Sequence, residues 1–240
     1  MLNRLVRELR RRMPGDHRFG EPLTLGRDAT PGLLGERLSL LAAERPSALK
    51  EVGFGALQVW QALSEAQGRG QGDRELAILF TDLVEFSSWA LEEGDERAIE
   101  LLRRVGGTVE PCVTARRGTV VKRLGDGLMA VFERPEDAVA AAWHATRGVD
   151  AIELDGYRPR LRAAVHVGRP RKLGGDYYGI DVNVAARMAG EARAGEVLVS
   201  DAVRERLPAG AAELQRRRRF RAKGAPRATQ AFRVEALAGA

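Results

Sequence analysis

The sequence predicts an α/β (α+β) fold: a ferredoxin-like βαββαβ sandwich with additional C-terminal strands, preceded by a small helical N-terminal region. Three observations lead to this prediction. Short apolar runs alternate with amphipathic helical patterns from residue 75 onward, in the order β-α-β-β-α-β that is typical of this sandwich. Gly125-Asp126-Gly127 separates two of the apolar runs and is typical of a hairpin turn. The 240 residues are 44% hydrophobic and 30% charged, which is the balance of a folded globular protein.

The first 72 residues are expected to form a separate helical region with a regulatory or dimerisation role. Apolar residues make one stripe over 2–13 and another over 47–66, with charged residues on the other faces. The Gly-rich stretch at 68–74 is the strongest linker signal of the chain. We therefore place the boundary there, between a helical region at 1–72 and an α/β domain at 73–240.

Each element of the α/β domain follows from its local pattern. The first is a short apolar run that ends at Thr81-Asp82, as expected of a buried strand. Pro111 lies inside the longest helical pattern and should kink that helix or end it early. The expected strands are 75–80, 118–124, 128–132, 161–167, 196–200 and a final pair at 216–222 and 228–237. The expected helices are 84–92, 95–115, 135–148, 182–190 and 201–207.

The composition excludes several classes of protein. A single cysteine, Cys112, and three histidines exclude a disulfide framework and a thiolate zinc site. His166 lies on an expected strand, where we expect a packed or hydrogen-bonded side chain rather than a metal ligand. No apolar run approaches the length of about 18 residues that a transmembrane helix needs, and the N-terminus lacks the apolar core of a secretory signal. We therefore expect a cytoplasmic protein with no transmembrane segment.

The net charge of +6 indicates a polyanionic partner: nucleic acid, an anionic membrane or a phosphorylated small molecule. The run Arg216–Arg219 has no interleaved aromatic residues and matches no nucleic-acid motif, so we expect no nucleic-acid partner. Only four of the 39 basic residues are lysines, so a lysine at a defined place carries more information than an arginine.

Two carboxylates occupy positions that suit a metal site. Asp82 directly follows the first strand, and Asp126 lies at the tip of the glycine-flanked hairpin. If the strands are neighbours, the two carboxylates meet at one edge of the sheet. A hard divalent cation such as Mg²⁺ is held by one or two carboxylates together with substrate phosphates. Each residue alone is also compatible with an ordinary helix cap or turn residue.

Four motifs together identify a family. The segments FTDLVEFS, KRLGDG, GDYYGIDVNVAARM and AKG follow one another in this order. The chain thereby resembles, over about residues 74–235, the catalytic domain of the class III nucleotidyl cyclases, the adenylyl and guanylyl cyclases. Gly174-Gly175-Asp176 could open a diguanylate cyclase motif, but Tyr-Tyr follows it and it lies after the hairpin, which argues against that family.

The resemblance implies roles for the two carboxylates and for a pair that reads the base. Asp82 and Asp126 match the metal-binding aspartates, assisted by the backbone carbonyl of Leu83. Lys122, four residues before Asp126, matches the residue that reads the purine, and Asp176 matches its partner. A Lys donor and an Asp acceptor complement the adenine edge, whereas guanylyl cyclases typically have Glu at the Lys122 position.

The resemblance also implies residues for the ribose and the phosphates. Asn183 and Arg187, spaced i,i+4 on one helix face, match the pair that positions the ribose and stabilises the transition state. Lys223 matches the lysine that holds the triphosphate. Arg171 is placed like an arginine that contacts the same phosphates, although the segment before Asp176 is shorter than in many family members.

The function implied by the resemblance is that of an adenylate cyclase, which makes 3′,5′-cyclic AMP and pyrophosphate from ATP with two Mg²⁺ or Mn²⁺ ions per site. The family's sites lie between two subunits, so the resemblance also implies a homodimer with composite active sites. Two alternatives remain open: a guanylate cyclase, and a catalytically silent nucleotide-binding regulatory module.

Overall fold

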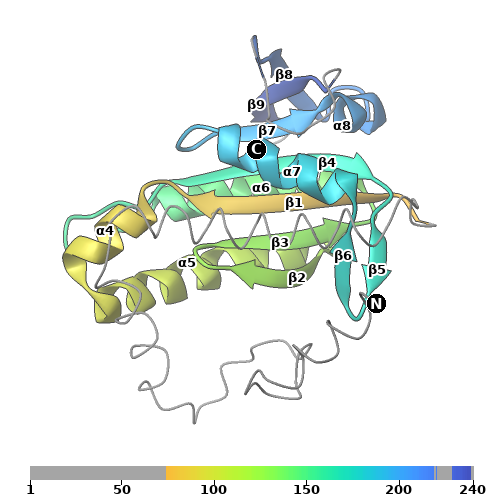
Figure 1. Cartoon of the computed structure of the whole chain (residues 1–240). Helices are drawn as coiled ribbons and strands as arrows, with labels where there is room; N and C mark the ends of the chain where they lie inside the picture. Colours follow the sequence, from red (N-terminus) through yellow and green to blue (C-terminus); the bar gives the residue numbers. More distant parts are fainter. Residues whose placement is uncertain (1–73, 219, 221–228, 239–240) are drawn as a thin grey trace, which may run out of the picture. The chain divides into compact units, whose positions relative to one another are not determined.

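The computed structural model describes residues 74–218, 220 and 229–238 (Figure 1). The helices expected at 2–13 and 47–66 and the whole of the proposed 1–72 region lie outside these residues, as does the linker at 68–74 apart from Arg74. Lys223 lies outside them as well.

A seven-stranded mixed sheet organises the domain, in the order β2-β3-β1-β4-β7-β9-β8. Neighbouring strands are antiparallel except for β4 and β7, which are parallel. Its first four strands have the order β2-β3-β1-β4, which confirms the βαββαβ sandwich with additional C-terminal strands. The strands are β1 (Leu76–Leu83), β2 (Thr119–Leu124), β3 (Gly127–Phe132), β4 (Leu161–Gly168), β7 (Val197–Ser200), β8 (Ala212–Arg216) and β9 (Ala231–Leu237).

Helices cover both faces of this sheet (Figure 1). On β1, Ala77 and Leu79 pack with α5 and α6, whereas Ile78 and Phe80 pack with α7 on the opposite face. Alternate side chains of a strand point to opposite faces, so a strand that is buried on both faces is apolar throughout. The helices are α4 (Phe86–Glu93), α5 (Asp95–Ala115), α6 (Pro135–Asp150), α7 (Ile180–Glu191) and α8 (Asp201–Arg206). Over the described ranges, none of them combines the length and apolar character needed to cross a membrane.

Three local expectations differ from the structure. The helix that contains Pro111 continues to Ala115 and does not end early. Pro111 has no N–H to donate to the carbonyl four residues earlier, but it lies on the exposed side of the helix, so that carbonyl can be hydrated. The first strand of the final pair is β8, which ends at Arg216 instead of starting there, because the apolar side chains that pack on the core precede the arginine run. A separate two-stranded hairpin of β5 (Arg171–Leu173) and β6 (Asp176–Tyr178) was not expected, since neither strand has an apolar run.

Candidate active site

Asp82 and Asp126 lie together at one edge of the main sheet. Asp82 is the seventh residue of β1, and the β2–β3 turn brings Asp126 against the end of that strand. The next residue, Gly127, lies so close to β1 that an added Cβ would be 2.0 Å from the carbonyl oxygen of Thr81. The turn therefore needs a glycine here, and this glycine lets the hairpin bring Asp126 near Asp82.

The two carboxylates interact electrostatically. Burial and the nearby charge of Asp82 raise the pKa of Asp126 from its ordinary value to about 7, although backbone hydrogen bonds at Asp126 and Leu83 act in the opposite direction. Leu83 therefore contacts this site through its backbone. Two neighbouring carboxylates whose charges repel each other favour binding of a divalent cation.

The residues present fit such a cation when substrate supplies further ligands. Among the described residues, no group of three or more His, Cys, Asp or Glu side chains is arranged to hold a metal ion. Two carboxylates are nevertheless the set that Mg²⁺ uses together with substrate phosphates. Asp82 and Asp126 are therefore the residues of this site that could hold such a cation.

Arg162 is a residue of this site that the sequence motifs did not indicate. It lies directly opposite Asp82 in the β1–β4 register, and its Nε and Nη2 lie 2.9 and 2.5 Å from Asp82 Oδ2. Its Nη1 donates to the carbonyl of Gly190 on α7 at 2.8 Å. Arg162 therefore neutralises Asp82 and connects the carboxylate site to α7. Asp82 and Arg162 are 80 positions apart, so only the strand register could have revealed their pairing.

Lys122 and Asp176 form an ion pair, as their proposed joint role requires. Lys122 Nζ donates to Asp176 Oδ2 at 2.6 Å, and the two side chains are 22% and 25% exposed. The pair joins β2 of the main sheet to β6 of the small hairpin. Asp176 Oδ1 also accepts from the backbone of Tyr177 at 2.7 Å, and the Tyr178 ring lies 5.9 Å from Lys122 Nζ. One ammonium and one carboxylate are thus held side by side between the main sheet and the small hairpin.

Asn183 and Arg187 are both on α7, four residues apart. Within the described part of the chain, Asn183 Oδ1 and Arg187 Nε are buried and have no hydrogen-bond partner. Buried polar atoms are normally satisfied, so two such atoms on one helix indicate that a ligand or a second subunit supplies the partners.

Two further residues, Arg171 and Lys223, are proposed for the triphosphate. Arg171 is exposed on β5, where it is paired in register with Tyr178. Lys223 falls at 221–228, outside the described residues. Both roles stay predictions.

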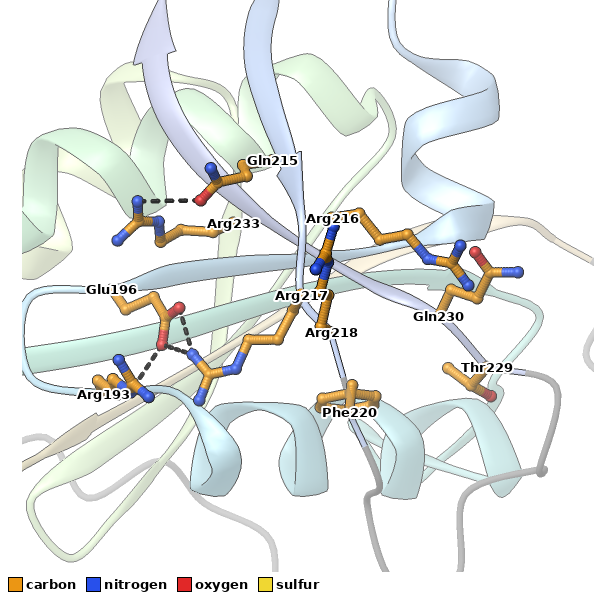
Figure 2. A pocket seen from close by; sticks show the side chains of 10 residues that line it. All are labelled: Arg193, Glu196, Gln215, Arg216, Arg217, Arg218, Phe220, Thr229, Gln230 and Arg233. Atoms are coloured by element: carbon orange, nitrogen blue, oxygen red, sulfur yellow. Dashed lines mark hydrogen bonds and ion pairs between the residues drawn. The ribbon is translucent and has the colours of Figure 1, made fainter.

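The arginine run before Lys223 lines a groove beside β8 and β9, shown in Figure 2. Arg217 is held there by an ion pair with the buried Glu196 and donates to the carbonyl of Glu191 at 3.2 Å. Arg216 and Arg218 extend in other directions from the same stretch (Figure 2). Arg217 thus makes a structural ion pair, whereas Arg216 and Arg218 contribute to a cationic surface.

Comparison with known proteins identifies the domain. The sequence model of the adenylate and guanylate cyclase catalytic domain matches residues 162–235. The pH-sensitive adenylate cyclase MT1302 of Mycobacterium tuberculosis (strain CDC 1551 / Oshkosh) is 35% identical over 136 residues, which are 57% of this chain and 33% of that protein. An adenylate cyclase of Streptomyces coelicolor (strain ATCC BAA-471 / A3(2) / M145) is 36% identical over 135 residues, 56% of this chain and 35% of that protein. The matched region is thus similar to the catalytic domain of the class III nucleotidyl cyclases. It spans about a third of the length of these relatives.

Solved structures agree with this fold for the cyclase domain. The guanylate cyclase domain of RhGC from Catenaria anguillulae, in complex with GTP, superposes with a TM-score of 0.64 at 18% identity, covering 69% of this chain and 98% of that one. The adenylyl cyclase CyaB from P. aeruginosa gives a TM-score of 0.56 at 19% identity, covering 69% and 96%. These likenesses concern the fold, because both identities are low.

Proposed function

We propose that the cyclase domain is an adenylate cyclase, which converts ATP to 3′,5′-cyclic AMP and pyrophosphate. The observation that carries this proposal is the ion pair of Lys122 and Asp176. Adenine presents an acceptor at N1 and an amino donor at N6, and this pair offers the complementary donor and acceptor. The identity of 35–36% to proteins named adenylate cyclase supports the same substrate.

The remaining residues fit the phosphate chemistry. The ribose 3′-hydroxyl attacks the α-phosphorus in line, its proton leaves, and the bond to pyrophosphate breaks. Asn183 orients the ribose through the amide oxygen that lacks a partner within the described residues. Arg187, four residues further on, stabilises the charge that grows on the α-phosphate oxygens. Lys223 and Arg171 are proposed to bind the triphosphate.

Asp82 and Asp126, with the backbone of Leu83, are proposed to hold two Mg²⁺ or Mn²⁺ ions. The chemistry these ions supply is a lowered pKa of the 3′-hydroxyl and neutralisation of charge on the attacking and leaving oxygens. When Asp82 binds a cation, the cation neutralises the carboxylate in place of the Arg162 guanidinium. Arg162 can then bind an anionic ligand instead of Asp82.

The active unit is proposed to be a homodimer with composite sites. One subunit would give the metal-binding aspartates, and the other the base-reading pair, Asn183 and Arg187. Exposed apolar side chains support a contact surface near the second set: Leu124 on β2 is 40% exposed, Leu173 on β5 43%, and Ile180 on α7 67%. Among structural neighbours, one guanylyl cyclase domain is described as dimeric and another as monomeric.

The test is turnover of ATP and GTP side by side by the purified full chain with Mg²⁺ or Mn²⁺. Formation of cyclic AMP well above that of cyclic GTP is expected. Dominant cyclic GTP would indicate the guanylate cyclase alternative, which the solved complex with GTP keeps open. Nucleotide binding without either product would indicate the silent regulatory module. Asp126→Ala is the matched control, and it should lose turnover while the domain stays folded, because Asp126 lies at a turn and not in the apolar core.

A further inference from the structure

Three polar side chains form a largely buried network that includes the first turn of α7, outside the residues used so far. His166 on β4 is 8% exposed and Ser200, at the end of β7, is fully buried. His166 Nδ1 lies 2.9 Å from Ser200 Oγ, and His166 Nε2 lies 3.4 Å from Asp181 Oδ1. The expectation that His166 is hydrogen-bonded within the fold is thereby confirmed. The network spans β4, β7 and the first turn of α7.

The bonding partners define what each group does. Ionised Asp181 only accepts hydrogen bonds, so His166 Nε2 carries the hydrogen that it shares with this carboxylate. Ser200 caps α8 by accepting from the backbone N–H of Val203 at 3.3 Å, which leaves its hydroxyl hydrogen available to His166 Nδ1. The His166 ring therefore bonds both neighbours at once.

Asp181 is held from a second side as well. Its Oδ2 accepts from the backbone N–H of Arg169 at 2.7 Å. Burial alone would raise the pKa of Asp181, but the hydrogen bonds from His166 and from the Arg169 backbone lower it. Gly168 leaves the room for this carboxylate, since an added Cβ would lie 2.1 Å from Asp181 Cγ. The first turn of α7 is thus tied to β4 through one side chain.

This tie adds a polar anchor to a helix that otherwise packs through apolar side chains such as Val182 and Val184. The helix follows Gly179, which makes no side-chain cap, and the preceding β5–β6 hairpin belongs to a separate sheet. Asp181 is two residues before Asn183 and six before Arg187, on the same rigid helix. A shift or rotation of the first turn would therefore move both proposed transition-state groups together.

We propose that His166 is a positioning residue, which through Asp181 sets the placement of α7 so that Asn183 and Arg187 meet the reacting ribose and α-phosphate. The inference rests on the proposed function of the site. A misplacement of about 1 Å can cost on the order of a hundredfold in rate, even far from the chemistry. Base reading and metal binding use other elements, so substrate affinity should change little.

The test compares three variants of the full chain with wild type. His166→Leu removes both hydrogen bonds, His166→Gln keeps an N–H donor near Asp181, and Thr146→Val is the matched control. Thr146 is also fully buried, and its hydroxyl donates to Ala142 within α6, on the opposite face of the sheet from α7. His166→Leu is expected to lower kcat by about 10- to 100-fold with the KM for ATP within about threefold. His166→Gln should recover most of that loss, and Thr146→Val should keep kcat within about twofold.

A second measurement does not depend on activity. Amide hydrogen exchange over 182–187, without nucleotide, should be faster in His166→Leu than in Thr146→Val. If wild type makes no cyclic nucleotide, the proposed function fails, and exchange alone then decides whether the tie exists. Should His166→Leu not fold, Asp181→Asn replaces it with the same expected kcat loss. A folded His166→Leu with wild-type kcat, or with exchange over 182–187 equal to that of Thr146→Val, overturns the proposal.

Discussion

At the scale of single residues, Asp126 links the carboxylate site to pH. Its pKa in the folded domain is about 7, above the ordinary value of 3.8. At a pH between these two pKa values, the folded, metal-free domain therefore keeps a proton that the unfolded chain has released. The resulting stabilisation is fully present below the lower value and is lost as the pH rises through the higher one. We expect the melting temperature of the metal-free chain to fall between pH 5 and pH 8 more steeply in wild type than in Asp126→Asn.

The control for this prediction is Mg²⁺. A cation that binds the ionised carboxylates stabilises the folded state, so added Mg²⁺ should raise the melting temperature more at pH 8 than at pH 5 in wild type. Equal pH slopes for wild type and Asp126→Asn would show that this carboxyl does not titrate in the expected range.

Glu85, three residues after Asp82, carries backbone strain at the same site. It has φ of 61° and ψ of 14°, in the left-handed region that favours glycine. Burial is the main cause that raises the pKa of Tyr157, and the charges of Glu85 and Asp126 raise it further. Glu85→Gly should therefore increase the free energy of unfolding in urea by roughly 0.5–1 kcal/mol.

Arg117 provides the matched control, because it is exposed and has φ of 56° at the end of α5. Arg117→Gly should give a similar gain without any change in turnover. If the free energy of unfolding rises for Arg117→Gly but falls for Glu85→Gly, the Glu85 side chain makes contacts that stabilise the fold by more than its backbone strain destabilises it.

At the scale of elements, the small β5–β6 hairpin matters because it brings Asp176 to Lys122 on β2. Lys122→Glu combined with Asp176→Ser should lower kcat/KM for ATP by about a hundredfold or more, since mismatched polar groups in a base-reading site lose their partners. Use of GTP should rise relative to ATP. Both are measured by initial rates over a range of nucleotide concentration.

Lys172→Glu on the same hairpin is the control, because Lys172 is exposed and lies beside the Tyr177 ring, 5.6 Å from its centroid. It should leave the preference for ATP unchanged. If the double variant also keeps that preference, Lys122 and Asp176 do not read the base.

At the scale of the whole molecule, the proposed homodimer can be tested by complementation. Asp82→Ala damages only the metal half of a site, and Arg187→Ala only the transition-state half. A mixed dimer then contains one intact site and one doubly damaged site. Mixing the two inactive variants should restore activity, up to about a quarter of wild type if half of the dimers are mixed and the sites act independently. Absent activity despite proven subunit exchange would indicate a self-contained site in one subunit.

The sequence by itself determined the order of the elements and the identity of most candidate residues. Alternation and periodicity are local properties, so β1, α6 and the β2–β3 hairpin could be predicted where they occur. The resemblance carried by the four motifs likewise pointed to Asp82, Asp126, Lys122, Asp176 and the α7 pair as candidates. The first strand of the final pair was placed wrongly, because a run of arginines carries no apolar pattern that defines a strand end.

Tertiary structure alone decided which of these residues meet. Arg162 faces Asp82 because β1 and β4 are neighbours in one register, and a shift of that register by one residue would turn Arg162 to the other face. His166 likewise finds Ser200 and Asp181 only after β4, β7 and α7 have packed together. Pairing across strands depends on contacts between positions far apart in the chain. Local patterns carry no information on such distances, so the partners of Asp82 and Asp181 could be known only from the folded domain.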